Sequence, residues 1–280
     1  MAPKGNESLT TQDIDAILTL AREAGAIAIA MRADATIETK ASATDLVTSA
    51  DKALSALLMQ KLAERFADDV VLSEESPWQA TEAGKRRWII DPIDGTKYYV
   101  ENTGKWAVMI GLVENGREVF GCFYMPAYDE ALLGGPGIGA WRYKDGQLTQ
   151  IEPQTQSMPV ATAEKPLRVM VSNNDLNANP WLKDLAGVEL VVASSIGVDV
   201  YELLADRADV FVHIRPTLGF WDTAAPGPVA SALGFEVGGD KLDYIHYPDD
   251  GEPRHQPAIV IGKTGALKWW RTLERPSKSK

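Results

Sequence analysis

Several features that define large classes of protein are missing from this 280-residue chain. It has one cysteine, Cys122, so no disulfide can form within the chain, and the apolar stretch FGCFYM around it predicts a buried structural thiol. No apolar run has the length of a membrane span, and the opening MAPKGNESLTTQD lacks the hydrophobic segment of a signal peptide. We therefore expect a cytoplasmic protein with no membrane partner.

Basic residues and histidines are also scarce. The chain has 28 Lys and Arg residues against 39 Asp and Glu, which gives a formal net charge of −11 at pH 7. A nucleic-acid polymer is not expected as a partner, and a nuclease is disfavoured, because such binding neutralises many phosphates with basic side chains. The three histidines, His213, His246 and His255, fall in no motif and are expected to be structural or at the surface. An acidic protein can still handle a small phosphate ester when metal cations reverse the sign of the local field.

The pattern of apolar residues predicts a mixed α/β protein. Helical spacing covers residues 13–31, and a second helix follows Thr48-Ser49-Ala50-Asp51, which has the form of a capping box. Asn115-Gly116 is typical of a tight hairpin. Strands are predicted at 70–73, 88–91, 106–113, 118–125, 167–172, 188–193, 208–214 and 258–262, and helices at 201–208 and 224–234. The polar, proline-bearing segment 146–166 predicts a boundary between a first part, residues 1–150, and a second part, residues 151–275.

An acidic cluster follows one of the predicted strands, in the stretch WIIDPIDGTK. Asp91 ends the strand, Pro92 fixes its own φ angle, Asp94 lies on the turn, and Gly95 permits a sharp change of direction. Two carboxylates and the carbonyl of Ile93 between them are ligands that suit Mg²⁺. The alternative is an ordinary turn in which the aspartates bond to their own backbone.

Other acids occupy similar positions elsewhere in the chain. Glu74 and Glu75 follow the strand VVLS, Asp222 lies in GFWDTAAP, and Asp51 lies in the capping box. Each has a structural alternative: a solvated loop for the glutamates, and helix caps for the two aspartates. Taken together, these acids predict a site at the ends of several elements, which is where α/β folds place their sites.

These residues resemble a known family, the Mg²⁺-dependent, lithium-sensitive phosphatases that include inositol monophosphatase and the 3′(2′),5′-bisphosphate nucleotidases. The resemblance rests on Lys40 with DLVTSAD (45–51), LSEES (72–76), WIIDPIDGTK (88–97), SSIG (194–197) and WDTAAP (221–226). It implies a layered α/β (α+β) fold, an αβαβα sandwich of the inositol monophosphatase and fructose-1,6-bisphosphatase type. Mixed sheets with flanking helices would form two subdomains, the first carrying most metal ligands and the second carrying Asp222.

The resemblance also implies roles for individual residues. Glu74, Asp91 and the Ile93 carbonyl would bind one Mg²⁺, and Asp91, Asp94 and Asp222 a second, with Glu74 also helping to hold a third. Thr96 would orient the attacking water, backed by Asp51. Such an enzyme hydrolyses a small phosphate ester without a covalent nucleophile, and a homodimer is a plausible assembly.

The substrate is less clearly indicated. Lys97 after DGT, with LSEE before it, resembles the bisphosphate nucleotidases; Lys97 and Arg215 are candidate cations for a second phosphate. The other candidate substrate-binding residues are Gly95, Thr96 and Ser195. Lys97 is otherwise a solvated helix residue, Arg215 a surface ion pair, and Phe220 either stacks on adenine or belongs to the core. We rank a nucleotidase first, then an inositol or sugar monophosphatase, then a histidinol-phosphate phosphatase, with a metal-binding pseudoenzyme as the non-enzyme alternative.

The segment after Asp222 fits a regular helix poorly. Gly227 and Pro228 disfavour a helix interior, by about 1 and 3 kcal/mol respectively relative to alanine. We therefore expect the helix in this segment either to begin after Pro228 or to be kinked there.

Overall fold

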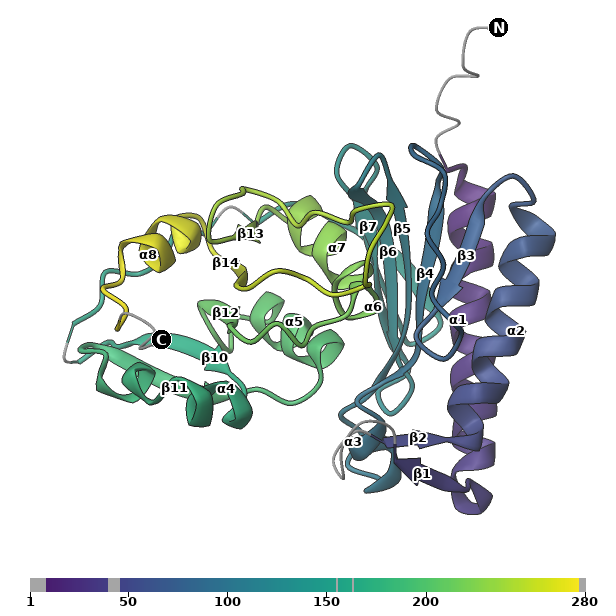
Figure 1. Ribbon diagram of the computed structural model, residues 1–280, viewed down its shortest axis with the longest axis horizontal. Helices are drawn as coiled ribbons and strands as arrows, with labels where there is room; N and C mark the ends of the chain where they lie inside the picture. The colour runs from purple at the N-terminus through teal and green to yellow at the C-terminus, as the bar shows by residue number, and fades with distance from the viewer. Residues whose placement is uncertain (1–8, 40–45, 155, 163, 277–280) are drawn as a thin grey trace, which may run out of the picture.

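The computed structural model describes residues 9–276 except 40–45, 155 and 163, so Lys40 and Asp45 of the first motif lie outside the described residues. The elements stack in five layers, which alternate helices and sheets in the order α-β-α-β-α, the architecture expected from the sequence (Figure 1). No helix in the described part of the chain is long and apolar enough to cross a membrane.

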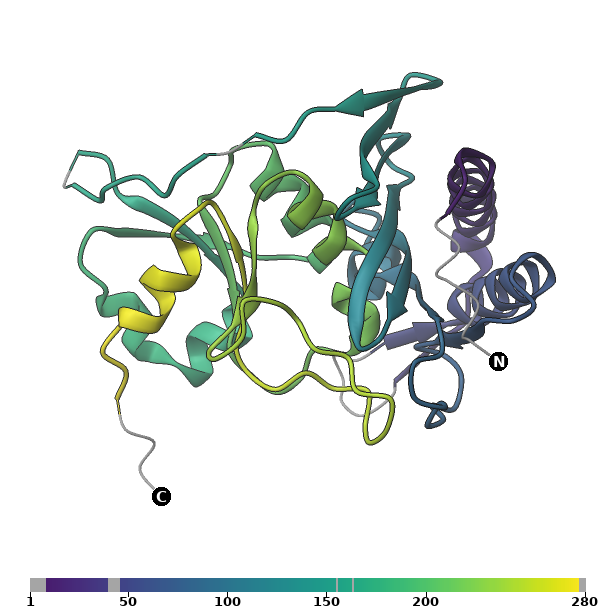
Figure 2. The same cartoon turned by 90° about the horizontal axis from the view of Figure 1, so that it is seen from above.

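The first layer contains the helices α1 (Thr11–Met31) and α2 (Ser49–Arg65). Both begin with a capping box, from Thr10 to Asp13 in α1 and from Thr48 to Asp51 in α2, as the sequence predicts for the second. Their apolar faces pack on one face of the larger sheet, with Leu54 of α2 fully buried in that core. The helices of the central layer cover the opposite face of the same sheet (Figure 2).

The larger sheet has seven strands in chain order, β3-β4-β5-β6-β7-β8-β9. Its strands are β3 (Val70–Ser73), β4 (Arg87–Asp94), β5 (Ala107–Glu114), β6 (Arg117–Met125), β7 (Glu130–Gly135), β8 (Gly139–Lys144) and β9 (Gln147–Ile151). β3 and β4 are parallel and the other neighbours antiparallel. The four strands predicted before residue 130 are confirmed, and Asn115 and Gly116 have the positive φ angles of a tight hairpin. The strands β7 to β9 were not predicted from the sequence; they are short, and β7 and β8 contain glycine. A separate pair, β1 (Ile37–Thr39) and β2 (Leu46–Thr48), is antiparallel.

The second sheet has the order β11-β10-β12-β14-β13. Its strands are β10 (Leu167–Val171), β11 (Val188–Val192), β12 (Val210–His213), β13 (Glu236–Gly239) and β14 (Ile259–Gly262). β10 is parallel to β11 and β12, whereas β14 is antiparallel to β12 and β13. Four of these strands are confirmed predictions and β13 is new. The outer layer contains α4 (Asn173–Ala178), the 3₁₀ turn Pro180–Asp184 and α8 (Ala266–Thr272).

The central layer contains α5 (Ile196–Leu204), α6 (Phe220–Thr223) and α7 (Pro226–Ala232). The helix predicted at 201–208 is wrong in its bounds, because α5 begins five residues earlier and has ended before Asp206, whose φ is +61°. The expectation that the next helix begins after Pro228 or is kinked there is also wrong. α7 begins at Pro226, so both prolines lie in its first turn, where backbone N–H groups have no partner within the helix.

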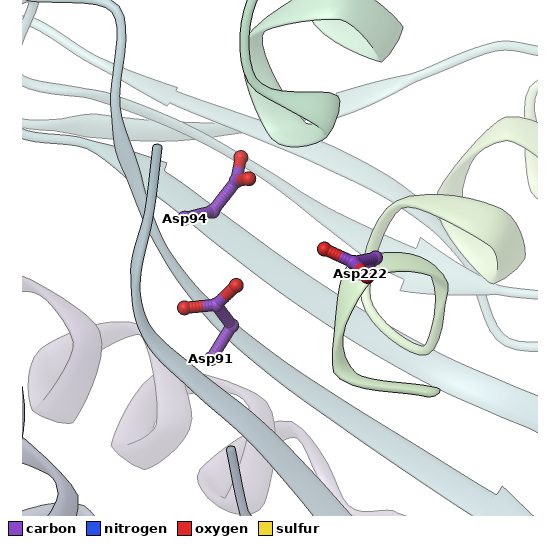
Figure 3. Close-up of side chains that lie close together, drawn as sticks. All are labelled: Asp91, Asp94 and Asp222. Carbon is purple, nitrogen blue, oxygen red and sulfur yellow. The ribbon is translucent and has the colours of Figure 1, made fainter. Parts of the chain in front are cut away.

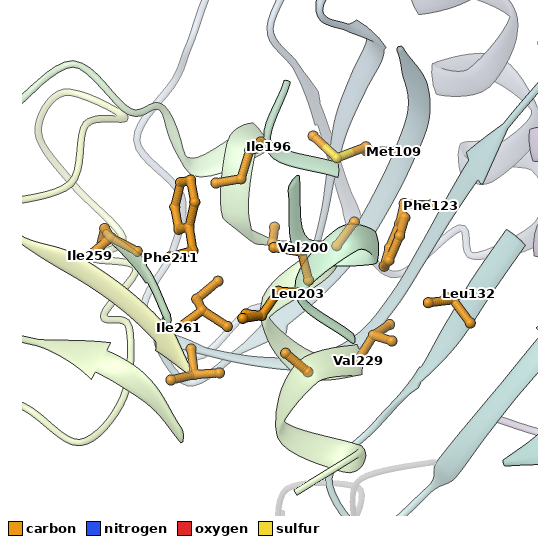
Figure 4. Packing of buried hydrophobic residues seen from close by; sticks show 14 of the residues in the cluster. Met109, Phe123, Leu132, Ile196, Val200, Leu203, Phe211, Val229, Ile259 and Ile261 are labelled. Atoms are coloured by element: carbon orange, nitrogen blue, oxygen red, sulfur yellow. The ribbon is translucent and has the colours of Figure 1, made fainter. Parts of the chain in front are cut away.

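A single hydrophobic core fills the space between the two sheets (Figure 4). Phe123 reaches it from the larger sheet, Phe211 and Ile261 from the smaller one, and Val200 and Val229 from the central helices. The larger sheet ends at Ile151 and the smaller begins at Leu167. Both sheets contribute to one core, so the division of the chain into two parts at residues 150 and 151 stays a prediction.

Glu118 on β6 is an unusual member of this packing. It is buried beside Gly227 of α7, and its Oε2 atom has no hydrogen-bond partner. Burial raises the pKa of Glu118 from 4.5 to about 8. Because the folded protein binds this proton more tightly than the unfolded chain does, this residue makes the free energy of unfolding fall as the pH rises through that interval.

Replacing Glu118 by glutamine removes this dependence. One pKa unit corresponds to about 1.4 kcal/mol, so we expect Glu118→Gln to gain about 2 kcal/mol of unfolding free energy relative to wild type between pH 6 and pH 8. Denaturant unfolding of both proteins across this range measures the difference. Parallel pH profiles would contradict the assignment of a buried proton to Glu118.

Candidate active site

A bulge in β4 brings Asp91 and Asp94 to the same side of the larger sheet. Residues three apart in a regular strand face opposite sides. Here Asp91 pairs with Met109 of β5 and Asp94 with Ala107, so one extra residue of β4 is accommodated between the two pairs. Because positions 107 and 109 are two apart, they face the same side, and so do the two aspartates. Proline has no N–H to donate to the ladder, and Pro92 is tolerated because the bulge interrupts the ladder at this point.

Gly95 turns the chain away from the sheet directly after Asp94. Its φ is +84°, and a Cβ atom there would lie 2.6 Å from Cβ of Ser195 and 2.9 Å from the carbonyl oxygen of Lys105. No other residue fits without displacing these neighbours. The helix α3 (Thr96–Val100) begins immediately afterwards.

Asp222 reaches the same place from α6, a helix of the central layer that packs on β4 and β5. It is the third residue of α6, and its Oδ2 accepts a hydrogen bond from the backbone N–H of Gly219 at 2.5 Å. The chain after it packs unusually close to the sheet: a Cβ atom on Gly111 would lie 2.3 Å from backbone atoms of Ala224, and one on Gly121 would lie 1.9 Å from the carbonyl oxygen of Ala225. Two glycines in β5 and β6 therefore determine how near Asp222 comes to β4.

The three carboxylates point toward one another (Figure 3). Asp91, Asp94 and Asp222 each offer an oxygen, and these oxygens lie within 4.8 Å of one another. Asp91 and Asp94 are 3 % and 5 % exposed, whereas Asp222 is partly exposed. The sequence had indicated this grouping only as a set of separate weak signals.

The electrostatics of this cluster disfavour three negative charges. Burial raises the pKa of Asp91 well above its usual range, and the charges of Glu74, Asp94 and Asp222 raise it further. Burial also raises the pKa of Asp94, to about 6, and that of Asp222. The charge of Glu74 raises the pKa values of all three aspartates, so its carboxylate acts on the cluster even though it lies outside the group of three.

Asp51 and Thr96 form a second pair beside the cluster. One oxygen of Asp51 accepts hydrogen bonds from the N–H and hydroxyl of Thr48 at 2.8 and 2.5 Å, which is its capping role. The other oxygen lies 3.2 Å from the Thr96 hydroxyl, which also lies 3.1 Å from the carbonyl oxygen of Ile93. A hydroxyl has one proton to donate, so only one of these two contacts can use it at a time.

Asp94 is held from the second half of the chain. It accepts hydrogen bonds from the backbone N–H groups of Ile196 at 3.2 Å and Gly197 at 2.7 Å, at the start of α5. Ser195 between the loop and α5 is buried close to this carboxylate and lowers its pKa, although its hydroxyl falls short of hydrogen-bond geometry. The SSIG stretch therefore orients a member of the cluster.

The donor set fits a hard divalent cation. The ligand atoms that the cluster offers are all carboxylate oxygens, and Mg²⁺ is typically bound by one or two carboxylates together with water and substrate phosphate. A cation also offsets the repulsion that raises the aspartate pKa values. The residues present therefore suit a metal ion better than three unpaired charges.

The two basic residues predicted to bind substrate, Lys97 and Arg215, each lie near an acidic side chain. Lys97 is exposed, and its Nζ lies 3.9 Å from Glu101 one turn further along α3. Arg215 donates from Nε to the buried Asp175 at 3.2 Å. Phe220 is buried against the rings of Trp78, Tyr247 and His255, so it belongs to the core and is unavailable for stacking on a base.

Two of the three histidines are buried and have structural contacts. His255 is buried and contacts the hydroxyl of Thr223, and His213 is buried against Asp175. His246 is exposed.

Sequence reasoning missed one basic residue near the cluster, Arg254, whose charge lowers the pKa of Asp222. Arg254 lies in a polar loop with no motif, so no local signal could have found it.

Comparison with known proteins identifies the family. The model of the inositol monophosphatase family matches residues 10–251. The chain belongs to this family. The 3′(2′),5′-bisphosphate nucleotidase CysQ of Escherichia coli K12 is 31 % identical over 205 residues, which cover 71 % of this chain and 79 % of that protein. Inositol monophosphatase 1 of Sus scrofa is 30 % identical over 253 residues, or 85 % of each chain.

Solved structures of the family share the fold. Staphylococcal IMPase-I complexed with products superimposes with a TM-score of 0.76 at 21 % identity, covering 97 % of this chain and all of that one. An IMPase/NADP phosphatase complexed with Mg²⁺ and phosphate also gives 0.76, at 20 % identity, covering 96 % and 99 % of the two chains. As a family member, the protein is a metal-dependent phosphoric monoester hydrolase. Its relatives at similar identity act on different substrates, so similarity alone does not choose the substrate.

The close packing of Asp222 on the sheet can be tested at Gly121. We expect Gly121→Ala to lower the free energy of unfolding by about 1–3 kcal/mol, the usual range for overpacking, and to weaken activity by displacing α6. Gly227→Ala is the matched control, because a Cβ atom there meets its nearest neighbour at 3.4 Å. Thermal unfolding and phosphate release measure both effects; equal behaviour of the two variants would contradict this account.

Because the carboxylates repel one another, removing one of them is expected to raise stability without metal and to abolish activity. In EDTA at pH 8 we expect Asp91→Asn to unfold at a higher temperature than wild type, because it removes one of the crowded carboxylates. Phosphate release with Mg²⁺ should fall below detection. Asp145→Asn, at an exposed turn, is the matched control and should change neither quantity. An Asp91→Asn protein that is less stable without metal would refute the repulsion, and one that still turns over would refute the role of Asp91.

Proposed function

We propose that this protein is a Mg²⁺-dependent 3′(2′),5′-bisphosphate nucleotidase that hydrolyses adenosine 3′,5′-bisphosphate or a similar small bisphosphate. The buried cluster of Asp91, Asp94 and Asp222 carries the catalytic part of this proposal, because its raised pKa values and all-oxygen donor set suit a divalent cation. The similarity to CysQ and the presence of Lys97 after DGT support the choice of substrate.

The proposal assigns two to three ions to these ligands. Glu74, Asp91 and the carbonyl of Ile93 would hold the first, and Asp91, Asp94 and Asp222 the second, with Glu74 also contributing to a third, weaker one. Bound Mg²⁺ supplies activation of a water molecule, neutralisation of phosphoryl oxygens and stabilisation of the departing alkoxide. The protein then needs no covalent nucleophile.

Thr96 and Asp51 position the attacking water in this proposal. When the Ile93 carbonyl is a metal ligand, the Thr96 hydroxyl directs its proton to Asp51, across the 3.2 Å contact. The hydroxyl oxygen would then keep lone pairs that can accept a hydrogen bond from the water. Because Asp51 is held by the cap of α2, this arrangement is rigid before substrate arrives.

The substrate phosphate is proposed to contact residues at the starts of two helices beside the cluster. These are Gly95 and Thr96 at the start of α3, and Ser195 at the start of α5. Lys97 and Arg215 are proposed to contribute positive charge. Since both have acidic partners, Glu101 and Asp175, their contribution is smaller than the sequence alone suggested.

An inositol or sugar monophosphatase is the second candidate. Inositol monophosphatase 1 of Sus scrofa covers 85 % of the chain and CysQ of Escherichia coli K12 covers 71 %, at nearly the same identity. The exposed, paired Lys97 also fits a role unrelated to substrate. Histidinol phosphate ranks third, because only the lysine after DGT points to it.

We further propose that the enzyme acts in the cytoplasm and forms a homodimer, on the basis of its single reduced thiol and its family.

The test is phosphate release with Mg²⁺ from adenosine 3′,5′-bisphosphate, inositol 1-phosphate, fructose 1,6-bisphosphate and histidinol phosphate. We expect the nucleotide to lead by at least about tenfold in kcat/KM, equivalent to about 1.4 kcal/mol. Activity should disappear with EDTA, as expected for a metal-dependent enzyme, and should be absent from Asp91→Asn protein purified in the same way, which excludes a contaminating phosphatase. A lead for a monophosphate would reject the nucleotidase, and no release from any of the four would favour a metal-binding pseudoenzyme.

A further inference from the structure

Arg254 lies next to Asp222 although 32 residues separate them in the chain. The loop between β13 and β14, residues 240–258, returns to the segment that precedes Asp222. There Arg254 pairs with Gly219 in an antiparallel bridge, and the N–H of Phe220 donates to the carbonyl of Pro253 at 3.0 Å. The N–H of His255 donates to the carbonyl of Leu218 at 2.9 Å. These backbone bonds hold position 254 beside the start of α6.

The side chain of Arg254 is oriented but not neutralised. Its guanidinium lies over the ring of Trp221, 5.2 Å from the centroid, and Nη1 donates to the carbonyl of Thr217 at 2.5 Å. The residue is exposed, and within the described part of the chain no carboxylate lies within ion-pair distance of it. Lys97 and Arg215, by contrast, each have an acidic partner. A stacked arginine loses little freedom on binding a ligand, which favours recognition.

The charge of Arg254 reaches the metal centre. It lowers the pKa of Asp222, the residue that follows Trp221, so the guanidinium is near enough to influence this carboxylate. It does not bind metal, because a guanidinium has no lone pair to offer. The remaining N–H groups form a fork of the kind that matches two oxygens of a phosphate.

We propose that Arg254 binds the phosphate group of the substrate that is not cleaved. The inference rests on the proposed function, since it assumes a substrate with a second anionic group. Arg254 also lines an open cavity of about 760 Å³, formed by residues between 238 and 259 and not by the three aspartates, so there is room beside the loop for the part of a substrate that is not cleaved. Arg254 is thus a specificity-determining residue and takes no part in the chemical step.

The test compares two substrates that share the same reacting phosphate, adenosine 3′,5′-bisphosphate and adenosine 3′-monophosphate. For Arg254→Gln we expect kcat/KM on the bisphosphate to fall at least about tenfold, mainly through KM, which corresponds to about 1.4 kcal/mol of lost binding. The fall on the monophosphate should be less than about threefold. Arg254→Lys keeps the charge without the fork and should give an intermediate ratio; it also serves if the glutamine variant folds poorly.

Arg117→Gln is the matched control. Arg117 is exposed and stacks on Tyr244 of the same loop, with its guanidinium 3.7 Å from the ring centroid, but it lies at the β5–β6 hairpin, at the opposite end of β5 from Ala107 and Asp94. We expect its bisphosphate-to-monophosphate ratio to equal that of wild type. Thermal unfolding of all variants separates loss of binding from loss of folded protein.

The outcomes distinguish the two proposals. If wild type prefers the bisphosphate and Arg254→Gln leaves the ratio of the two substrates unchanged, the role of Arg254 is refuted and the nucleotidase stands. Equal losses on both substrates also refute it, because they place the effect at the metal centre or in the fold. If wild type does not prefer the bisphosphate, the proposed function fails, and the role of Arg254 fails with it.

Discussion

Mutual repulsion among the carboxylates of Asp91, Asp94 and Asp222 is the constraint around which this structure is organised. Three acids whose oxygens lie within 4.8 Å of one another, two of them buried, would separate if the chain allowed it. A bulge in β4 prevents Asp91 and Asp94 from facing opposite sides, and α5 donates two N–H groups that hold Asp94 in place. A bound cation offsets the repulsion, so the stability of the site and its ability to hold metal have the same physical origin.

The layered fold supplies the rigidity that the cluster requires. The three aspartates come from the larger sheet and from the central helical layer that packs on it, so these two layers must be packed in a single relative position before the site exists. Gly111 and Gly121 allow the backbone of Ala224 and Ala225 to approach the larger sheet closely, and Asp222 is thereby brought to β4. Asp51 serves α2 as a cap and Thr96 as a hydrogen-bond acceptor, which ties the outer helical layer to the same site.

The residues proposed to select the substrate lie outside the cluster of three aspartates. The metal centre is common to a family whose members act on different phosphate esters, and CysQ and inositol monophosphatase 1 are similar to this chain at 31 % and 30 % identity. The nearby cations lie on α3, on the segment before α6 and on the loop between β13 and β14. Their pairing decides their use: a lysine or arginine next to a carboxylate offers less to a phosphate than an arginine stacked on an indole.

The sequence by itself determined what local patterns encode. The capping box from Thr48 to Asp51, the Asn115-Gly116 hairpin and most strands depend on residues within one turn or one strand, and the acids are recognisable from short motifs. The packed structure alone decided which of these groups meet. Asp222 and Asp94 are 128 positions apart, and Arg254 carries no motif, so their proximity follows from the packing of the two sheets and the path of one loop. Local propensity is a property of a few neighbouring residues, whereas electrostatic contact between distant segments exists only after the core has formed.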